Sequence, residues 1–510
     1  MGQTEKRLPH LRRTDSRTQL IVDGQPFIAL AGEVHNSSAS SLEYMEGVWE
    51  SLVAARCNTA IVPIYWELLE PEEGRFDFTL VDGILAGARK RSLRLILLWF
   101  GTWKNAMSTY APAWVKRDLG RFPRAQVYPG VSTSAISALS EQARRADARA
   151  FAQLMRHLKL KDGDQNTVIM VQVENETGLL GGARDVSPPA ELAYAAPVPR
   201  RLMGYLEEHR ESLIPEFAAL WAAAGGMLSG TWEEVFGDAA AEVFMAWHVA
   251  GYVDAVAAAG KAEHPLPMFV NTWLPGHPGA QPGTYPSGGP TARMMDVWRA
   301  AAPHVDALAP DIYLPTFAEV CAEYARAGNP LIIPEAHRDV AYANAFAAIA
   351  QHDALCFAPF GIDGMPDVSR LAESYELLSS MMPVIVEYQG SGRMAGIAQQ
   401  TAAPLHFPLG GYDLQITVNR ADPGEHPRGR GLVIALSDTE YLVAGAGFTI
   451  RWAPKPGDRR QVEFIAVDEG AYDHGVWKTR RRLNGDEASG AFLRLEDTLT
   501  ACRVELHSFR

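Results

Sequence analysis

Cysteine is scarce in this chain, and no cysteine has the spacing of a metal site. The four cysteines are Cys57, Cys321, Cys356 and Cys502. They form no Cys-x-x-Cys pair, whereas zinc sites take their ligands from closely spaced pairs. The sequence also lacks a GxSxG elbow, an HExxH helix and a phosphate-binding glycine loop. Serine-hydrolase, zinc-protease and nucleotide-dependent chemistry therefore have no site, and we expect neither a metal nor a cofactor.

Positive charge is in deficit. The chain has 47 Lys and Arg against 60 Asp and Glu, which gives a net charge of -13. An acidic surface repels the phosphate backbone of nucleic acids and anionic membranes. We therefore expect no nucleic-acid and no membrane partner, and a neutral substrate fits this charge. A homo-oligomer is left open.

Long apolar runs are missing as well. No segment approaches the ~20 apolar residues of a membrane-spanning helix. The first thirteen residues are polar and basic and lack the apolar centre of a signal peptide. These two features predict a cytoplasmic protein.

The bulk composition is that of a folded globular protein with more than one domain. Hydrophobic residues make up 47% and charged residues 21% of the 510 positions, which is close to ordinary globular usage. A prior of roughly 150 residues per domain gives several units. A large barrel with one accessory domain would fit this length.

Short apolar runs alternate with helical patterns in the first three quarters of the chain. Eight such runs are expected as strands: 27–30, 59–66, 93–100, 168–173, 268–273, 307–314, 331–334 and 355–360. Nearly continuous apolar runs suit parallel strands that are covered by helices. Eight strand-helix units predict an α/β fold of the closed (β/α)8 TIM barrel type.

The predicted barrel domain covers residues 1–382, and its last helix is expected at 368–382. The connection over 177–266 is too long for a simple crossover and carries helical patterns of its own, so we interpret it as a helical insertion on the rim. Residues 383–510 change to short alternating runs separated by Gly, Pro and Asp. This pattern predicts a C-terminal antiparallel, β-sandwich-like domain, with a linker at 389–403.

Two of the eight predicted strands end in glutamate. The fourth strand leads into Glu174-Asn175-Glu176, and the seventh ends at Glu335. In a barrel, the carboxyl ends of the strands meet at one mouth. Two carboxylates across a sugar can divide glycoside hydrolysis, because one protonates the leaving oxygen while the other attacks the anomeric carbon. The alternative for any single glutamate is a solvated or salt-bridged side chain.

Residues 172–176 resemble the Gln-Val-Glu-Asn-Glu motif of glycoside hydrolase family 35 β-galactosidases. Other similar segments are 27–35, 58–59, 66–76 and 110–114. The resemblance implies that Glu176 is the acid/base, that Glu335 is the nucleophile, and that Asn175 donates to the sugar 2-hydroxyl. Glu174 would point away from the sugar. Since alternate residues of a strand share a side, Glu174 and Glu176 need a local bend to take different roles.

The chain also departs from the family 35 pattern. Glu67 and Leu69 stand where Asn and His are usual, and Thr177 follows the acid/base where Tyr or Phe is usual. The run from Trp99 to Asn105 differs from the usual Gly-Pro-Tyr pattern. These differences indicate a divergent branch, related to the family 42 enzymes at the level of the clan.

Further polar and aromatic residues follow the strands and could contact the sugar. Hydroxyl-binding candidates are Glu33, His35, Asn36 and Glu67. Candidates with aromatic rings are Trp103, Trp273 and Tyr313, and Tyr313 could hydrogen-bond Glu335. A salt bridge or a cap is the alternative for each polar residue, and rim packing is the alternative for each tryptophan.

The function expected from these observations is a retaining exo-acting β-galactosidase that hydrolyses terminal β-D-galactosides by double displacement, with a neutral carbohydrate as its substrate. The first alternative is another exo-β-glycosidase of the same clan, acting on glucosides, arabinosides or fucosides. The second is a non-hydrolytic carbohydrate-binding protein in which the C-terminal domain binds sugar. The presence of both glutamates argues against the second alternative.

Overall fold

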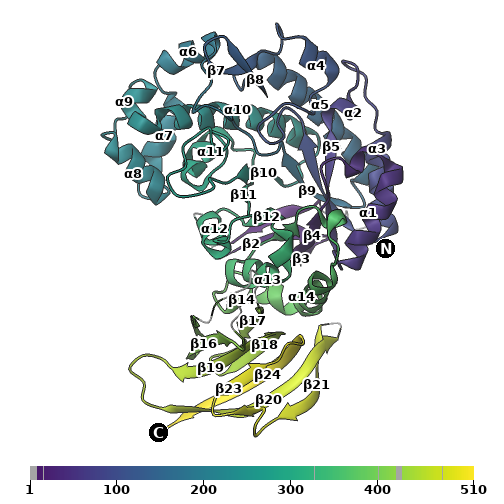
Figure 1. Ribbon diagram of the computed structural model, residues 1–510, viewed down its shortest axis with the longest axis vertical. Helices are drawn as coiled ribbons and strands as arrows, with labels where there is room; N and C mark the ends of the chain where they lie inside the picture. Colours follow the sequence, from purple (N-terminus) through teal and green to yellow (C-terminus); the bar gives the residue numbers. More distant parts are fainter. Residues whose placement is uncertain are drawn as a thin grey trace, which may run out of the picture.

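A computed structural model describes residues 8–14, 17–326, 328–399, 401, 403–420, 428–473 and 475–510. Figure 1 shows a barrel surrounded by helices, with a layered β domain at one end of the molecule. The N-terminal strands β1 (His10–Arg13), β2 (Thr18–Val22) and β3 (Gln25–Phe27) form a small antiparallel sheet. They lead directly into the first barrel strand.

The barrel is a closed sheet of eight parallel strands in the order β11-β10-β9-β6-β5-β4-β13-β12. The two end strands meet through the parallel bridge between Ile312 and Ala336. The Ile312 N–H also donates to the Glu335 carbonyl at 2.8 Å. The strands are β4 (Ala29–Glu33), β5 (Thr59–Tyr65), β6 (Arg94–Phe100), β9 (Val168–Val173), β10 (Met268–Trp273), β11 (Ala307–Asp311), β12 (Ile332–Ala336) and β13 (Cys356–Pro359). The (β/α)8 prediction is therefore confirmed, with small shifts at strand ends.

Helices follow the strands and cover the outside of the barrel (Figure 1). They are α1 (Leu42–Ala54), α2 (Trp66–Leu69), α3 (Thr79–Lys90), α4 (Ala113–Arg117), α5 (Glu141–Asp162), α11 (Met295–Ala301), α12 (Phe317–Tyr324), α13 (Ala341–Phe346) and α14 (Ser369–Tyr388). A hairpin of β7 (Arg124–Tyr128) and β8 (Val131–Ile136), which the apolar pattern did not predict, lies between α4 and α5.

The long connection between β9 and β10 is helical, as expected. It contains α6 (Pro188–Ala195), α7 (Arg200–Glu208), α8 (Pro215–Ala223), α9 (Trp232–Phe236) and α10 (Ala240–Glu263). The stretch Trp232–Glu263 is long and apolar enough to cross a membrane by length and composition alone, with a mean hydropathy of 1.3. This differs from the expectation that no segment approaches a membrane span. However, α10 packs along α5 and α11, and its apolar side chains are buried there. It is therefore built as a core helix.

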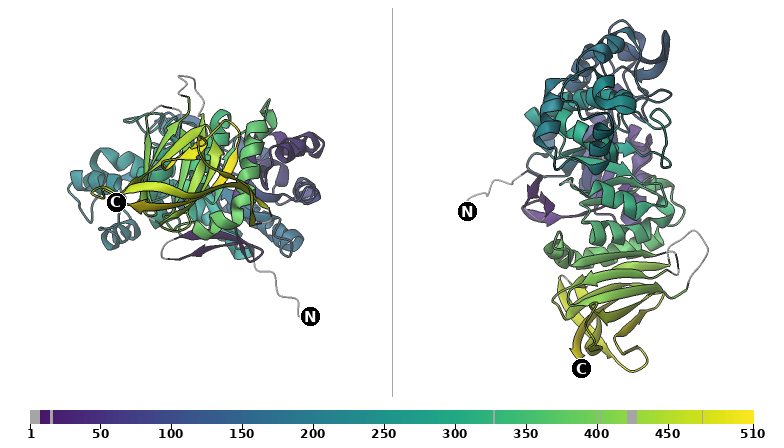
Figure 2. Two further views of the ribbon diagram at one scale, coloured as in Figure 1. Left: turned by 90° about the horizontal axis from the view of Figure 1, so that it is seen from below. Right: turned by 90° about the vertical axis from the view of Figure 1, so that its left-hand side faces the viewer.

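The C-terminal region contains two antiparallel sheets. The six-stranded sheet has β14 (Met394–Gln399), β17 (Gly429–Ala435), β18 (Glu440–Ala446), β20 (Gln461–Asp473), β21 (Val476–Leu483) and β24 (Thr500–Phe509). The five-stranded sheet has β15 (Leu405–Leu409), β16 (Tyr412–Val418), β19 (Phe448–Pro454), β22 (Ala488–Ser489) and β23 (Phe492–Leu495). Figure 2 shows both sheets stacked beyond the barrel helices.

Strands β14, β17 and β18 of the six-stranded sheet are buried on both faces, which explains why they are apolar. In β17, Leu432 and Ile434 join the core of the barrel, whereas Val433 and Ala435 join a second core shared with the five-stranded sheet. Alternate residues of a strand face opposite sides, so both sets must be apolar. This sheet is therefore a middle layer between the barrel helices and the outer sheet.

The junction differs from the expected boundary at residues 382 and 383. Helix α14 continues to Tyr388 and includes Pro383. The expected linker at 389–403 contains β14, which pairs along β17 and contacts α13. The weak periodicity and three glycines of this run are typical of a linker, but the run forms a strand. Gly396 is needed there because a Cβ would lie 2.4 Å from the Phe346 carbonyl oxygen.

Candidate active site

The chain bends sharply after β9, at the two glutamates of the expected motif. Glu174 has φ of +63° and Glu176 has φ of +45°, a region that residues with side chains rarely adopt. The bend is held by the Asn175 N–H, which donates to the Trp103 carbonyl at 3.2 Å, and by the Glu176 N–H, which donates to Asn271 Oδ1 at 2.8 Å. The predicted local bend is thus present.

Glu335 lies on β12 and is 4% exposed. The Tyr313 hydroxyl donates to Glu335 Oε2 at 2.7 Å, as predicted. The amide groups of Asn175 and Asn271 donate to Glu335 Oε1 at 3.3 and 3.4 Å. Three side chains from three strand ends therefore fix the orientation of this carboxylate.

Glu176, Asp311 and Glu335 meet at the mouth. One carboxyl oxygen of each lies within 4.8 Å of those of the other two. Asp311 ends β11 and accepts from Asn271 Nδ2 at 2.7 Å. Sequence reasoning missed Asp311 and Asn271, because both lie inside apolar runs that were treated as strand. An ionisable residue at the carboxyl end of such a run is the signal that could have found Asp311.

The environment of Glu176 favours its protonated form. Burial, followed by the charge of Glu335, raises the pKa of Glu176 to about 8. The positive charge of Lys104 acts in the opposite direction. A carboxyl that holds its proton at neutral pH can serve as a general acid.

Glu33, at the end of β4, is a further buried carboxyl near this group. Both of its oxygens are buried without a hydrogen-bond partner among the described residues. Burial and the charge of Glu335 raise the pKa of Glu33 well above its ordinary value, and Lys104 lowers it. Lys104 is 5% exposed, and its Nζ lies 5.2 Å from the centre of the Phe100 ring. The positive charge of Lys104 therefore acts on both Glu33 and Glu176.

Glu176, Asp311 and Glu335 could also hold a divalent cation, since carboxylate oxygens are the ligands that Mg²⁺ and Ca²⁺ prefer. Two features fit this less well. Tyr313 and Asn271 already donate to two of these carboxylates, and the Lys104 charge acts on Glu176 and Asp311. We therefore interpret the cluster as a site for hydroxyl groups and proton transfer.

The other predicted binding residues fall into different positions. Trp273 and Tyr313 are 37% and 44% exposed, so their rings are open to solvent. Trp103 differs from the prediction: its ring is 1% exposed and packs edge-on against Tyr252. Sugar stacking needs an open ring face, so this ring cannot stack on a sugar. Trp103 contacts the site through its backbone N–H and carbonyl instead.

Two of the polar candidates pair with neighbouring side chains. His35 Nδ1 lies 2.9 Å from Asp363 Oδ1, and Glu67 accepts from Lys116 Nζ at 2.9 Å. These pairs are the alternative that the sequence left open for both residues. Asn36 keeps a buried Oδ1 that has no partner among the described residues. Their sugar-binding roles stay predictions.

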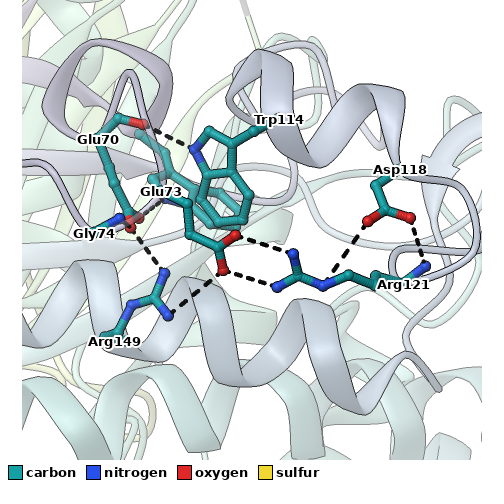
Figure 3. A network of polar contacts seen from close by, with 8 residues as sticks. Glu70, Glu73, Gly74, Trp114, Asp118, Arg121 and Arg149 are labelled. Atoms are coloured by element: carbon teal, nitrogen blue, oxygen red, sulfur yellow. Dashed lines mark hydrogen bonds and ion pairs between the residues drawn. The ribbon is translucent and has the colours of Figure 1, made fainter.

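The Glu-Pro-Glu-Glu-Gly-Arg-Phe segment supports the barrel wall (Figure 3). Glu70 is fully buried; it accepts from Trp66 Nε1 at 2.9 Å and from Arg149 at 2.8 Å. Its carbonyl accepts from Trp114 Nε1 at 3.1 Å. The network therefore joins two motif segments, 66–76 and 110–114, to helix α5.

Comparisons with known proteins give two family matches. A family described as β-galactosidase, glycoside hydrolase family 42, matches residues 41–235, and a domain of unknown function, DUF5597, matches residues 371–494. The matched family belongs to the same clan as family 35, but the family 35 assignment itself finds no support. The comparisons support a likeness of the chain to β-galactosidases of this clan.

Individual relatives are distant. A β-galactosidase from Xanthomonas manihotis is 25% identical over 167 residues, which are 32% of this chain and 25% of that protein. A catalytic mutant of Gan42B, a GH42 β-galactosidase from G. stearothermophilus, has a TM-score of 0.52 at 10% identity, covering 94% of this chain and 99% of that one. A β-galactosidase from Bacillus circulans sp. alkalophilus has a TM-score of 0.47 at 14% identity and covers 72% and 59%. The likeness to Gan42B shows a shared fold.

Proposed function

We propose that this chain is a retaining exo-acting β-galactosidase that hydrolyses terminal β-D-galactosides by double displacement. The observation that carries the proposal is the pair of glutamates at the ends of strands four and seven, with carboxyl oxygens within 4.8 Å. Retaining glycosidases place their carboxyls about 5 to 5.5 Å apart, whereas inverting enzymes need a wider gap for water. The match to the β-galactosidase family supports the galactoside as substrate.

In the first half-reaction, a Glu335 oxygen attacks the anomeric carbon as the bond to the leaving oxygen breaks. Glu176 gives its proton to that oxygen, so the aglycone departs as an alcohol. Because the pKa of Glu176 is raised, its carboxyl still holds this proton at neutral pH. The result is a galactosyl ester on Glu335 and an ionised Glu176.

In the second half-reaction, water attacks the same carbon, Glu176 accepts a proton from the water, and the ester bond to Glu335 breaks to release Glu335 as a carboxylate. While Glu335 is esterified it carries no negative charge, so the repulsion that raised the pKa of Glu176 is reduced and Glu176 can act as the base. Tyr313 and Asn175 hold the carboxylate of Glu335 before attack and after release. Two inversions retain the β configuration.

A panel of nitrophenyl glycosides tests the substrate class, and proton NMR of the first-formed sugar tests the stereochemistry. The proposal expects preferred turnover of the β-galactoside and initial release of the β anomer. Preference for a glucoside, arabinoside or fucoside would select the clan-related alternative. Saturable sugar binding without hydrolysis would select the binding protein, and initial release of the α anomer would exclude double displacement.

We also propose a cytoplasmic location and a C-terminal domain that supplies no catalytic residue. The proposed catalytic groups and their hydrogen-bond partners all lie before α14. Cell fractionation tests the location. Light scattering of the purified protein tests whether it forms a homo-oligomer.

A further inference from the structure

A second pair of acids lies behind the bend after β9. Glu174 follows β9 and Asp147 lies on helix α5, and both are fully buried. Gly101, directly after β6, lies against both carboxyls: a Cβ there would lie 2.7 Å from Glu174 Oε1 and 2.8 Å from Asp147 Oδ1. The two carboxyl oxygens therefore converge on the same small space, which a side chain at position 101 would fill.

The two carboxyls differ in their donors. Asp147 accepts from Trp99 Nε1 at 2.8 Å, from the Thr102 N–H at 3.1 Å and from the Tyr252 hydroxyl at 3.3 Å. Such a set of donors stabilises an ionised carboxylate. Asp147 is thus equipped to carry the negative charge of the pair.

Glu174 has fewer donors. Its Oε2 accepts from the Trp103 N–H at 2.6 Å, while its Oε1 is buried without a donor among the described residues. A buried polar atom normally has a partner, and the group that faces Oε1 is the Asp147 carboxylate. A proton on Oε1 would satisfy both acids at once.

We propose that Glu174 and Asp147 share one proton, bonded to Glu174 and donated to Asp147, and that this neutral-plus-ionised pair positions Glu176. The inference rests on the proposed function of Glu176. Two ionised carboxylates in contact, both out of water, would repel each other strongly. Burial and the nearby Asp147 also raise the pKa of Glu174 well above its ordinary value.

The pair acts through the backbone of Trp103. That residue donates its N–H to Glu174 and accepts at its carbonyl from the Asn175 N–H. One bond holds the Glu174 side chain and the other holds the Asn175 N–H, so Trp103 restrains the strained bend at two neighbouring residues. Glu176 follows with its own positive φ, so its side chain direction depends on this fastening.

Conservative and disruptive variants separate a positioning role from a general loss of structure. Glu174→Gln keeps an acceptor for Trp103 and gains an amide donor toward Asp147, so it mimics the protonated acid. Asp147→Asn removes the charge that accepts three donors, and Glu174→Ala removes the link. A matched control is Asp162→Asn, which changes another buried aspartate, at the C-terminal end of the same helix, where it pairs with Arg89.

The readout is kcat/KM on lactose and on dinitrophenyl β-galactoside, since only lactose needs strong proton donation to its leaving group. We expect Glu174→Gln to stay within about threefold of wild type on both. Glu174→Ala and Asp147→Asn should lose on the order of 10²-fold on lactose and less than about tenfold on the activated substrate. The Asp162→Asn control should melt earlier but keep the wild-type ratio between substrates.

Equal losses on both substrates, or a Glu174→Gln variant as damaged as Glu174→Ala, would overturn the positioning role. The proton itself is tested without turnover, by the infrared difference spectrum of wild type minus Glu174→Gln at pH 7. A protonated carboxyl stretch in that spectrum supports the shared proton, and a carboxylate stretch overturns it. This measurement does not need the enzyme to be a galactosidase, so a wild type inactive on every galactoside would contradict the proposed function separately.

Discussion

Acidic residues behave differently at the barrel mouth and in the outer part of the C-terminal domain. On β20, Asp468 pairs with Arg482 at 2.8 Å and Glu469 pairs with Arg481 at 2.9 Å, both near solvent. The bond to Arg482 lowers the pKa of Asp468. At the mouth, Glu33 has no partner among the described residues and Glu176 has a raised pKa.

The difference shows where this chain accepts a cost in stability. Carboxyls that are buried together and kept from water destabilise the folded state, and such arrangements persist where function requires them. Strained backbone occurs at the same place, at Glu174 and Glu176. The C-terminal sheets instead pair their surface charges in the ordinary way. Activity should therefore depend on the barrel and not on the paired surface charges of these sheets.

The largest effect is expected from Glu335→Gln, which removes the nucleophile and keeps its size. Turnover of nitrophenyl β-galactoside should fall on the order of 10⁴-fold or more. Asp311→Asn serves as the comparison, because it changes a carboxyl of the same cluster that attacks nothing, and it should lose much less. Steady-state kinetics of the two variants decide this. A greater loss in the Asp311 variant would move the nucleophile to Asp311.

A somewhat smaller effect is expected from Glu176→Ala. Loss of the proton donor should cost about 10²- to 10⁴-fold on lactose and much less on dinitrophenyl galactoside. With the activated substrate, the loss of the base should leave deglycosylation limiting. Added azide, which needs no base, should then restore turnover and yield β-galactosyl azide.

An equal loss on both substrates, with no azide effect, would make Glu176 a binding residue. The proton donor would then lie elsewhere. Because Glu174 shares the bend with Glu176, it would be the first acid to test.

Stability should respond in the opposite direction from activity in Glu176→Gln. The folded pKa of about 8 exceeds the ordinary value near 4.3. Between these values the folded protein keeps a proton that the unfolded chain has lost, so wild-type stability falls as the pH rises from about 4.3 to 8. The variant lacks this loss. Its melting temperature should match that of wild type at pH 4.5 and exceed it at pH 8. The free energy of unfolding at pH 8 should be larger in the variant by on the order of a few kcal/mol.

Thermal melts at the two pH values measure this gain. Glu72→Gln, at an exposed position paired with Arg75, is the control in which no such pH-dependent gain is expected. A Glu176→Gln protein that melts with the same offset at both pH values would show that Glu176 is ionised in the folded protein.

The smallest effect is expected from Arg482→Ala on β21, in the C-terminal domain. The change breaks the pair with Asp468, and exposed pairs contribute little to stability. The kinetic constants should equal those of wild type. A loss of turnover with an unchanged melting curve would show that the C-terminal domain contributes to catalysis.

The sequence was sufficient for the barrel because its strands are buried on both sides and read as apolar runs between helices. It was also sufficient for the two strand-end glutamates, whose bend could be argued from strand alternation. It was weaker at β14, where Gly396 is required by close packing rather than by a turn. A proline such as Pro383 predicts the end of a helix, but α14 continues through it to Tyr388.

Parts of the site depend on contacts that no local pattern contains. Asp311 and Asn271 are joined to Glu335 and Glu176 only when β10, β11 and β12 close the barrel. Trp103 was expected to face the sugar, but its place beside Tyr252 is set by the distant helix α10. Long-range packing therefore decides which strand-end residues face the mouth.

The most direct test of the account is to trap and locate the covalent intermediate. A 2-deoxy-2-fluoro-β-galactoside with a dinitrophenyl leaving group should inactivate the enzyme, because the fluorine slows both half-reactions while the activated leaving group speeds only the first, so the glycosyl-enzyme accumulates. Proteolysis and mass spectrometry should then place the added fluorogalactosyl group on Glu335. A label on Asp311 or Glu176, or turnover without any label, would contradict the assignment of Glu335 as nucleophile.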